Sequence, residues 1–140
     1  MQSENVKAFK NELRNYNFYL TRIKKINSLI EYCYSLLPQS VHAIDYSQPV
    51  IHGAPNKDNE YRIRDDISKH EANVKSTQAK VNEVDEILAL METSLKRAVI
   101  DVYVEGKRIE DIAILHHLSI GGLQYRIDKE IERCLNVKNY

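Results

Sequence analysis

Two long stretches of this chain carry apolar side chains at a seven-residue spacing, and a proline-containing segment separates them. In the first stretch, residues 6–37, two sets of apolar residues are offset by three places. The sets are Val6, Leu13 and Leu20, and Phe9, Tyr16, Ile23, Ile30 and Leu37. This spacing predicts one long amphipathic helix whose apolar stripe packs against a partner helix.

Two features of this first helix bear on what covers it. Asn27 falls where an apolar residue is expected, so a buried Asn fixes the register, or the helix ends there, or its apolar face shifts towards Ile26. A second apolar stripe lies on roughly the opposite side and comprises Phe18, Leu29, Tyr32 and Leu36. Because one partner helix cannot cover two faces, the C-terminal part of the chain or a second subunit must cover this stripe, and we expect a homodimer.

The segment between the two stretches, residues 38–59, contains all three prolines and shows no sustained period, which predicts a long loop. Its apolar residues are candidates for packing across a hairpin or for a functional contact: Val41, Ile44, Tyr46, Val50 and Ile51. The seven-residue spacing then resumes as Ile67, Val74, Val81, Leu88 and Leu95, interleaved with His70, Thr77, Val84 and Met91. Two helices joined by one loop most simply pair antiparallel, so residues 1–93 are expected to form a coiled-coil-like hairpin arm.

Residues 94–140 show shorter helical segments that are typical of a helix-turn-helix. An apolar face that starts at Leu95 ends at Gly106, a residue suited to a left-handed helix cap. A second helix is expected over residues 109–116, with two acidic residues in its first turn, where the helix dipole favours them. A third helix is expected from Ile120 to about Leu135, with Ser119 as its N-cap. The chain is therefore predicted to be all-α.

The third of these helices carries most of the residues that we expect to bind DNA. Its inward face repeats every four residues as Leu123, Ile127, Ile131 and Leu135, and its outward face comprises Gln124, Tyr125, Asp128 and Lys129. The small side chain of Ala113 lets the last two helices cross closely, so the outward face is free to enter a major groove. The candidate contacts to bases and phosphates are Lys107, Arg108, Ser119, Gly121, Gly122, Gln124, Tyr125, Arg126, Lys129 and Arg133.

Three short motifs of this region, Tyr103-Val104-Glu105-Gly106-Lys107, Glu110-Asp111-Ile112-Ala113 and Leu118-Ser119, resemble region four of bacterial sigma factors. That region reads the upstream promoter element. The whole layout, with Asp45-Tyr46-Ser47 in the proline-bearing loop, is similar to small phage late-transcription activators of the RinA and ArpU type. The resemblance implies a protein that binds double-stranded DNA at a promoter, contacts RNA polymerase and activates late phage genes.

Several positions depart from the sigma-factor pattern. His117 replaces the usual turn glycine, His116 replaces the apolar residue before it, and Arg108 stands where Ser or Thr is common. Gly121 and Gly122 occupy the start of the third helix, where each glycine costs about 1 kcal/mol of helix stability relative to Ala. Either the bare backbone there approaches a phosphate closely, or the helix begins one turn later.

Charge leaves other functions open. The chain has 20 basic and 20 acidic residues, and over residues 94–140 the basic ones exceed the acidic ones by one. DNA binding normally needs an excess of positive charge, so a protein that binds polymerase or a host factor without touching DNA stands as one alternative to the regulator. The other is a small terminase subunit for DNA packaging, which also joins a helix-turn-helix to helical oligomerisation segments.

Motifs for catalysis, metal binding and membrane insertion are missing from the sequence. The five histidines and two cysteines lack metal-ligand spacings, and there is no nucleophile elbow or phosphate loop. We therefore expect no enzyme, no cofactor and no small-molecule substrate, with Cys33 and Cys134 as buried apolar residues. Because no apolar run is long enough to span a bilayer and the N-terminus is polar, we expect a cytoplasmic protein without membrane contact.

Overall fold

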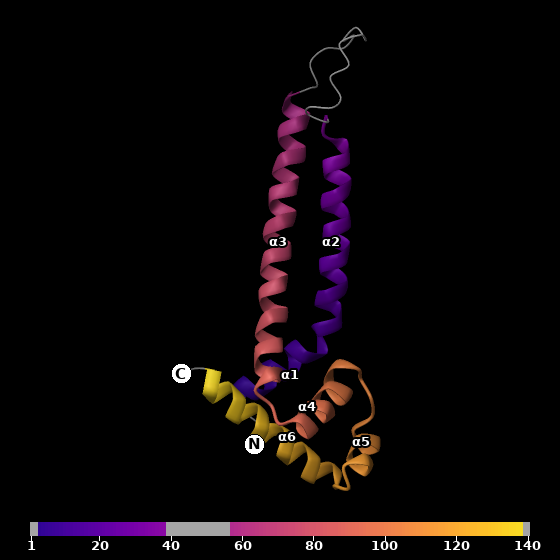
Figure 1. The fold of residues 1–140 in the computed structure, drawn as a ribbon, viewed down its shortest axis with the longest axis vertical. Helices are drawn as coiled ribbons and strands as arrows, with labels where there is room; N and C mark the ends of the chain where they lie inside the picture. Colours follow the sequence, from indigo (N-terminus) through magenta and orange to yellow (C-terminus); the bar gives the residue numbers. More distant parts are fainter. Residues whose placement is uncertain (1–2, 39–56, 139–140) are drawn as a thin grey trace. The chain divides into compact units, whose positions relative to one another are not determined.

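The computed structural model describes residues 3–38 and 57–138, and both stretches are almost entirely helical (Figure 1). The elements are α1 (Glu4–Arg14), α2 (Tyr16–Leu36), α3 (Lys57–Ala89), α4 (Thr93–Val99), the π-helical turn η1 (Ile100–Val104), α5 (Ile109–Leu115) and α6 (Ile120–Lys138). The fold class is all-α, as predicted, with a helical hairpin followed by shorter helices. Within the described ranges no helix is both long and apolar enough to cross a membrane.

The structure describes only the two ends of the predicted loop, residue 38 and residues 57–59. Its last residues, 57–59, already belong to α3. The apolar loop residues Val41, Ile44, Tyr46, Val50 and Ile51, the Asp45-Tyr46-Ser47 motif, His42 and His52 lie outside the described residues.

The chain divides into two compact units, and α2 and α3 each contribute to both. We call residues 1–20 and 79–140 the head, and residues 21–78 the arm. The sequence placed the boundary between residues 93 and 94, with the whole N-terminal region in the arm. The division falls elsewhere because α1 and the last turns of α3 share a buried core with the C-terminal helices.

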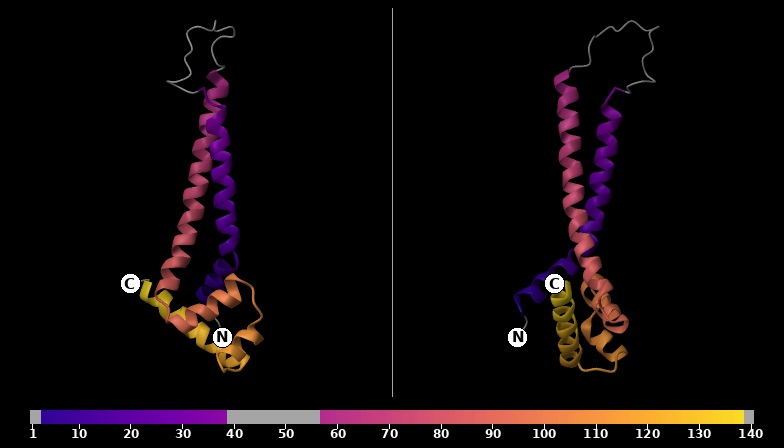
Figure 2. Two further views of the ribbon diagram at one scale, coloured as in Figure 1. Left: turned by 45° about the vertical axis from the view of Figure 1, so that its right-hand side comes forward. Right: turned by 60° about the vertical axis from the view of Figure 1, so that its left-hand side comes forward.

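In the arm, α2 and α3 run antiparallel and lie side by side in every view (Figures 1 and 2). Ile26 and Ile67 are buried in the seam between them. Asn27 is exposed, so the alternative in which the apolar face shifts towards Ile26 is confirmed. The buried hydroxyl of Thr77 is satisfied, because it donates a hydrogen bond to the carbonyl of Asn73 at 2.8 Å. Of the predicted seam residues in the arm, Ile67 and Thr77 are buried, whereas Ile23, Ile30 and Val74 are half-buried.

No residue of the described ranges covers the second apolar stripe of α2. In the arm, Leu29, Tyr32 and Leu36 are 47%, 60% and 49% exposed. The expectation that a second subunit covers them stays a prediction.

The predicted first helix is interrupted at Asn15, which caps the end of α1 and stands directly before α2. The N–H of Asn15 donates to the carbonyl of Asn11 at 3.1 Å, and its own carbonyl accepts from Tyr19 at 2.8 Å. At its other end, α1 is capped by Ser3, whose hydroxyl accepts from the N–H of Val6. Leu20, which the heptad pattern placed in the stripe with Leu13, is 40% exposed.

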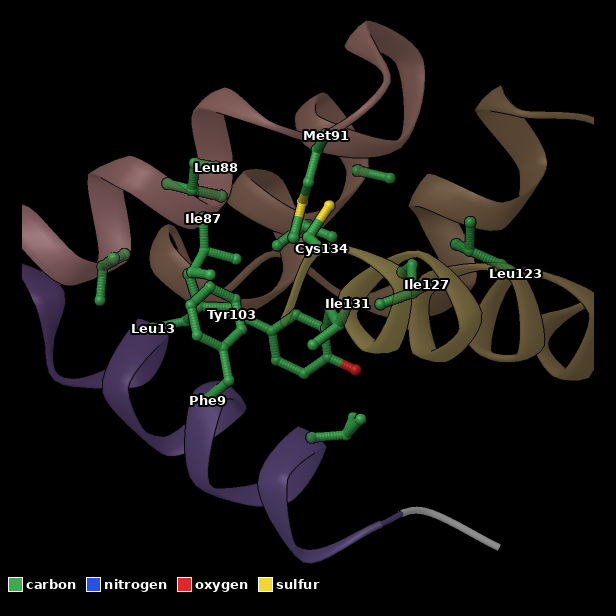
Figure 3. Close-up of a cluster of buried hydrophobic side chains, with 14 of the residues drawn as sticks. Phe9, Leu13, Ile87, Leu88, Met91, Tyr103, Leu123, Ile127, Ile131 and Cys134 are labelled. Carbon is green, nitrogen blue, oxygen red and sulfur yellow. The ribbon is translucent and has the colours of Figure 1, made fainter. Parts of the chain in front are cut away.

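The core of the head draws buried residues from α1, α3, α4, η1, α5 and α6. Figure 3 shows Phe9 and Leu13 of α1 directed towards the same cluster as Ile127 and Ile131 of α6. The buried members are Val6, Phe9, Leu13, Val84, Ile87, Leu88, Met91, Ala98, Val99, Tyr103, Ile112, Ala113, Leu123, Ile127, Ile131 and Cys134. The four-residue repeat predicted for the inner face of α6 is confirmed, although its fourth member, Leu135, is only partly buried.

The two cysteines differ from one another. Cys134 is fully buried, and burial raises the pKa of its thiol. Cys33 is half-buried and unpaired, so only Cys134 fits the predicted role of a small core residue.

Candidate nucleic-acid interface

The turn between α5 and α6 has tight geometry in spite of its unusual residues. His117 adopts φ 58, the left-handed conformation that glycine adopts most easily. The N–H of Leu118 donates to the carbonyl of Ala113 at 2.9 Å and closes the turn. Ala113 is 2% exposed, so its small side chain lies in the packed core where the predicted crossing requires it. His117 therefore adopts the conformation of a turn glycine without opening the turn.

The start of α6 is capped as predicted. The hydroxyl of Ser119 accepts a hydrogen bond from the N–H of Gly122 at 3.0 Å. Gly121 and Gly122 both lie in the first turn of the helix, so the alternative of a start one turn later is wrong. A Cβ on Gly121 would meet no atom within 4 Å, whereas one on Gly122 would lie 3.0 Å from the Ser119 hydroxyl. Gly121 thus presents open backbone at the surface.

The outer face of α6 is exposed along most of its length. Gln124, Arg126 and Lys129 are exposed, and the Tyr125 side chain is 64% exposed. The ammonium of Lys129 lies 5.6 Å from the centre of the Tyr125 ring, within the range of a cation–π interaction. Of these predicted contact residues, Tyr125, Arg126 and Lys129 line one surface hollow, whereas Gln124 is exposed outside it.

Asp128 is the exception on the predicted outer face. Its carboxylate forms an ion pair with Lys10 of α1, whose side chain is almost fully buried. The Lys10 ammonium also lies 5.2 Å from the centre of the Tyr103 ring. Asp128 therefore helps to attach α1 to α6, and the sequence pattern missed this contact.

A hollow of 350 Å³ lies beside this face, between α4 and α6. Its lining residues are Leu95, Tyr125, Arg126, Lys129, Glu130 and Arg133. Three of these are cations and one is an acid. The predicted phosphate contacts of α6 therefore share one concave surface.

Arg133 is largely engaged in the fold. Its Nε donates to the Glu130 carboxylate at 2.5 Å, and its Nη2 donates to the carbonyl of Leu90 at 2.9 Å. Glu130 is 7% exposed and also accepts from the N–H of Glu92 at 2.8 Å. The hydrogen bond from Arg133 lowers the pKa of Glu130, and the Glu92 N–H lowers it further against the effect of burial. Together, Glu130 and Arg133 hold the link between α3 and α4 against α6.

Lys107 and Arg108, the two predicted DNA contacts in the link before α5, both lie close to acidic side chains. Lys107 is 3.3 Å from the Asp101 carboxylate and 3.2 Å from that of Glu105, and both contacts raise the pKa of its ammonium. Arg108 forms an ion pair with Glu110 at 3.6 Å. Both cations therefore neutralise charge within the head, and neither is brought to the hollow beside α6.

Sequence reasoning missed three exposed aliphatic side chains around the turn. Ile114 and Leu115, at the end of α5, are 71% and 70% exposed, and Ile120, at the start of α6, is 41% exposed. The shortness of α5 was a signal of this exposure. Ile112 and Ala113 are enough to attach so short a helix to the core, so its other aliphatic side chains stay at the surface. Ile120 stands next to the predicted DNA contacts, where an aliphatic side chain suits a thymine methyl group.

In the part of the chain that the structure describes, no three His, Cys, Asp or Glu side chains are arranged to hold a metal ion. No protein-family model matches this chain, and no curated protein or solved structure matches it either.

Proposed function

We propose that this chain is a sequence-specific DNA-binding regulator of transcription, an activator of late genes in a phage or prophage, and that α5, the turn and α6 act as a helix-turn-helix. One observation carries the proposal. The inner face of α6 is fixed in the head core by Leu123 and Ile127, while Gln124 and Tyr125 on its outer face remain exposed. A helix that is anchored on one side and polar and free on the other fits a major groove.

Each residue of the outer face has a role in this mechanism. Gln124 offers an amide that can pair with an adenine edge, and Tyr125 adds a phenol beside it. Lys129 and Arg126 supply positive charge to backbone phosphates. The proposal has three further parts. The protein contacts RNA polymerase, it acts in the bacterial cytoplasm, and two subunits pair through the second apolar stripe of α2.

Replacing Gln124 or Tyr125 with alanine is expected to weaken discrimination at one base pair by about 1–3 kcal/mol while leaving non-specific binding nearly unchanged. The measurement is fluorescence anisotropy with duplexes chosen by selection of the purified protein on a random DNA library, compared with scrambled duplexes. Gln78→Ala is the control for Gln124→Ala, because it removes the same type of side chain from α3, outside the proposed helix-turn-helix. Equal specificity in both α6 variants and the control would rule out base reading by this face.

Gly121→Ala is expected to stabilise the free protein by up to about 1 kcal/mol, because alanine is the better helix former and its methyl group would meet nothing. The same methyl group would hinder a phosphate that approaches the bare backbone, so we expect weaker DNA binding despite greater stability. Gly122→Ala is the contrast, since its methyl group would crowd the Ser119 cap. Higher stability together with unchanged affinity in Gly121→Ala would remove the close approach from the mechanism.

A second candidate function is binding to polymerase or a host factor without DNA. The exposed side chains of Ile114 and Leu115 favour it, because contiguous exposed aliphatic groups are typical of protein contact sites. Retention of polymerase on the immobilised protein, with no DNA shift at low salt, would select this function. Light scattering tests the packaging alternative, because a large ring would favour a terminase subunit and a dimer would favour a regulator.

A further inference from the structure

The hollow between α4 and α6 contains more positive charges than its acidic groups neutralise. Its one acid, Glu130, already accepts hydrogen bonds from Arg133 and from the backbone of Glu92. Arg126 and Lys129 form no ion pair with any residue of the described ranges. Once the Glu130–Arg133 pair is counted as neutral, the lining keeps two positive charges.

The remaining polar groups of the hollow are all hydrogen-bond donors. Arg126 and Lys129 stand three residues apart on α6, so their side chains project from the same side of the helix. The phenol of Tyr125 adds an O–H, and Leu95 forms an apolar wall on the α4 side. An arginine fork matches the geometry of a phosphate, and a lysine beside it adds a point charge. A group with several acceptor oxygens can engage these donors together, whereas a carboxylate offers only two.

We propose that the hollow lined by Leu95, Tyr125, Arg126 and Lys129 is a binding site for a single phosphate group. The site lies on the flank of α6, next to the outer face that carries Gln124. If α6 enters a groove, this flank faces the sugar–phosphate strand that borders the groove. The choice of a DNA backbone phosphate as the occupant therefore rests on the proposed function, whereas the phosphate chemistry rests on the lining alone.

The first arm of the test is an NMR titration of the full chain with inorganic phosphate at constant ionic strength. The backbone amides of Leu95, Arg126 and Lys129 are expected to shift saturably, and the double variant Arg126→Gln/Lys129→Gln should bind phosphate roughly ten-fold more weakly or worse. The matched control is Arg62→Gln/Lys75→Gln, which removes the same two charges from exposed positions of α3. Phosphate shifts that are absent, or that are equal in the double variant and the control, would overturn the site.

The second arm measures duplex binding against salt concentration for the same proteins. Loss of the single phosphate contact should reduce the slope of log affinity against log salt by about 1, while the Arg62→Gln/Lys75→Gln control keeps the wild-type slope. Phosphate binding in the hollow without duplex binding would keep the site, assign it to a free phosphate or nucleotide, and refute the proposed function. Sequence-specific duplex binding that ignores Arg126 and Lys129 would keep the proposed function and refute the site.

Discussion

Leu13→Ala is expected to lower the free energy of unfolding of the head by about 2–5 kcal/mol, the usual range for a leucine that leaves a cavity in a packed core. Leu13 is 0% exposed and lies in the cluster that joins α1 to α6 (Figure 3). Urea unfolding followed by far-ultraviolet circular dichroism measures the change.

Leu20→Ala is the matched control, because Leu13 and Leu20 occupy equivalent positions of the seven-residue pattern. Leu20 is 40% exposed, so we expect its replacement to cost less than about 1 kcal/mol. A continuous heptad helix would make the two substitutions similar in effect. Equal losses would therefore show that the helix is not broken at Asn15.

The contrast between Leu13 and Leu20 shows what periodicity can predict in this chain. The spacing of apolar residues indicates which side of a helix is buried, and it identified Leu13, Ile67 and Ile127 correctly. It does not show where a helix bends, because the break at Asn15 falls on an exposed residue that leaves the apolar pattern intact. The assignment of α1 to the head depends on tertiary packing, which no local signal of the sequence carries.

In the candidate site, too, some features could be predicted from the sequence and others could not. Capping chemistry at Ser119 and the small residue Ala113 could be predicted because both depend on local geometry. The partners of charged side chains could not, since they come from distant parts of the chain. Asp128 pairs with Lys10, 118 residues away, and Arg133 donates to a carbonyl 43 residues away. A charged residue on an outer helical position therefore needs the tertiary structure before a role in DNA binding is given to it.

Variants of Glu130 and Arg133 can distinguish a structural role of Arg133 from a role in DNA binding. Glu130→Ala is expected to destabilise the head by about 2–4 kcal/mol, because the N–H of Glu92 loses its acceptor and Arg133 loses a charged partner. Arg133→Ala should also lower stability, and its effect on duplex affinity should disappear when binding is measured at a temperature where the variant is fully folded. Glu132→Ala, an exposed acid on the same helix, is the control and should change stability by less than about 0.5 kcal/mol.

The pH dependence of the Glu130 contribution has a defined sign. Its pKa in the folded protein lies below the ordinary value of 4.5, chiefly because Arg133 donates to the carboxylate. The charged form therefore stabilises the folded state above pH 4.5, and this stabilisation is lost as the pH falls through the folded-state pKa. The stability gap between the wild type and Glu130→Gln should be constant near neutral pH and should shrink in acid. A gap that widens on acidification would mean that burial, which favours the protonated carboxyl, outweighs the hydrogen bonds from Arg133 and Glu92.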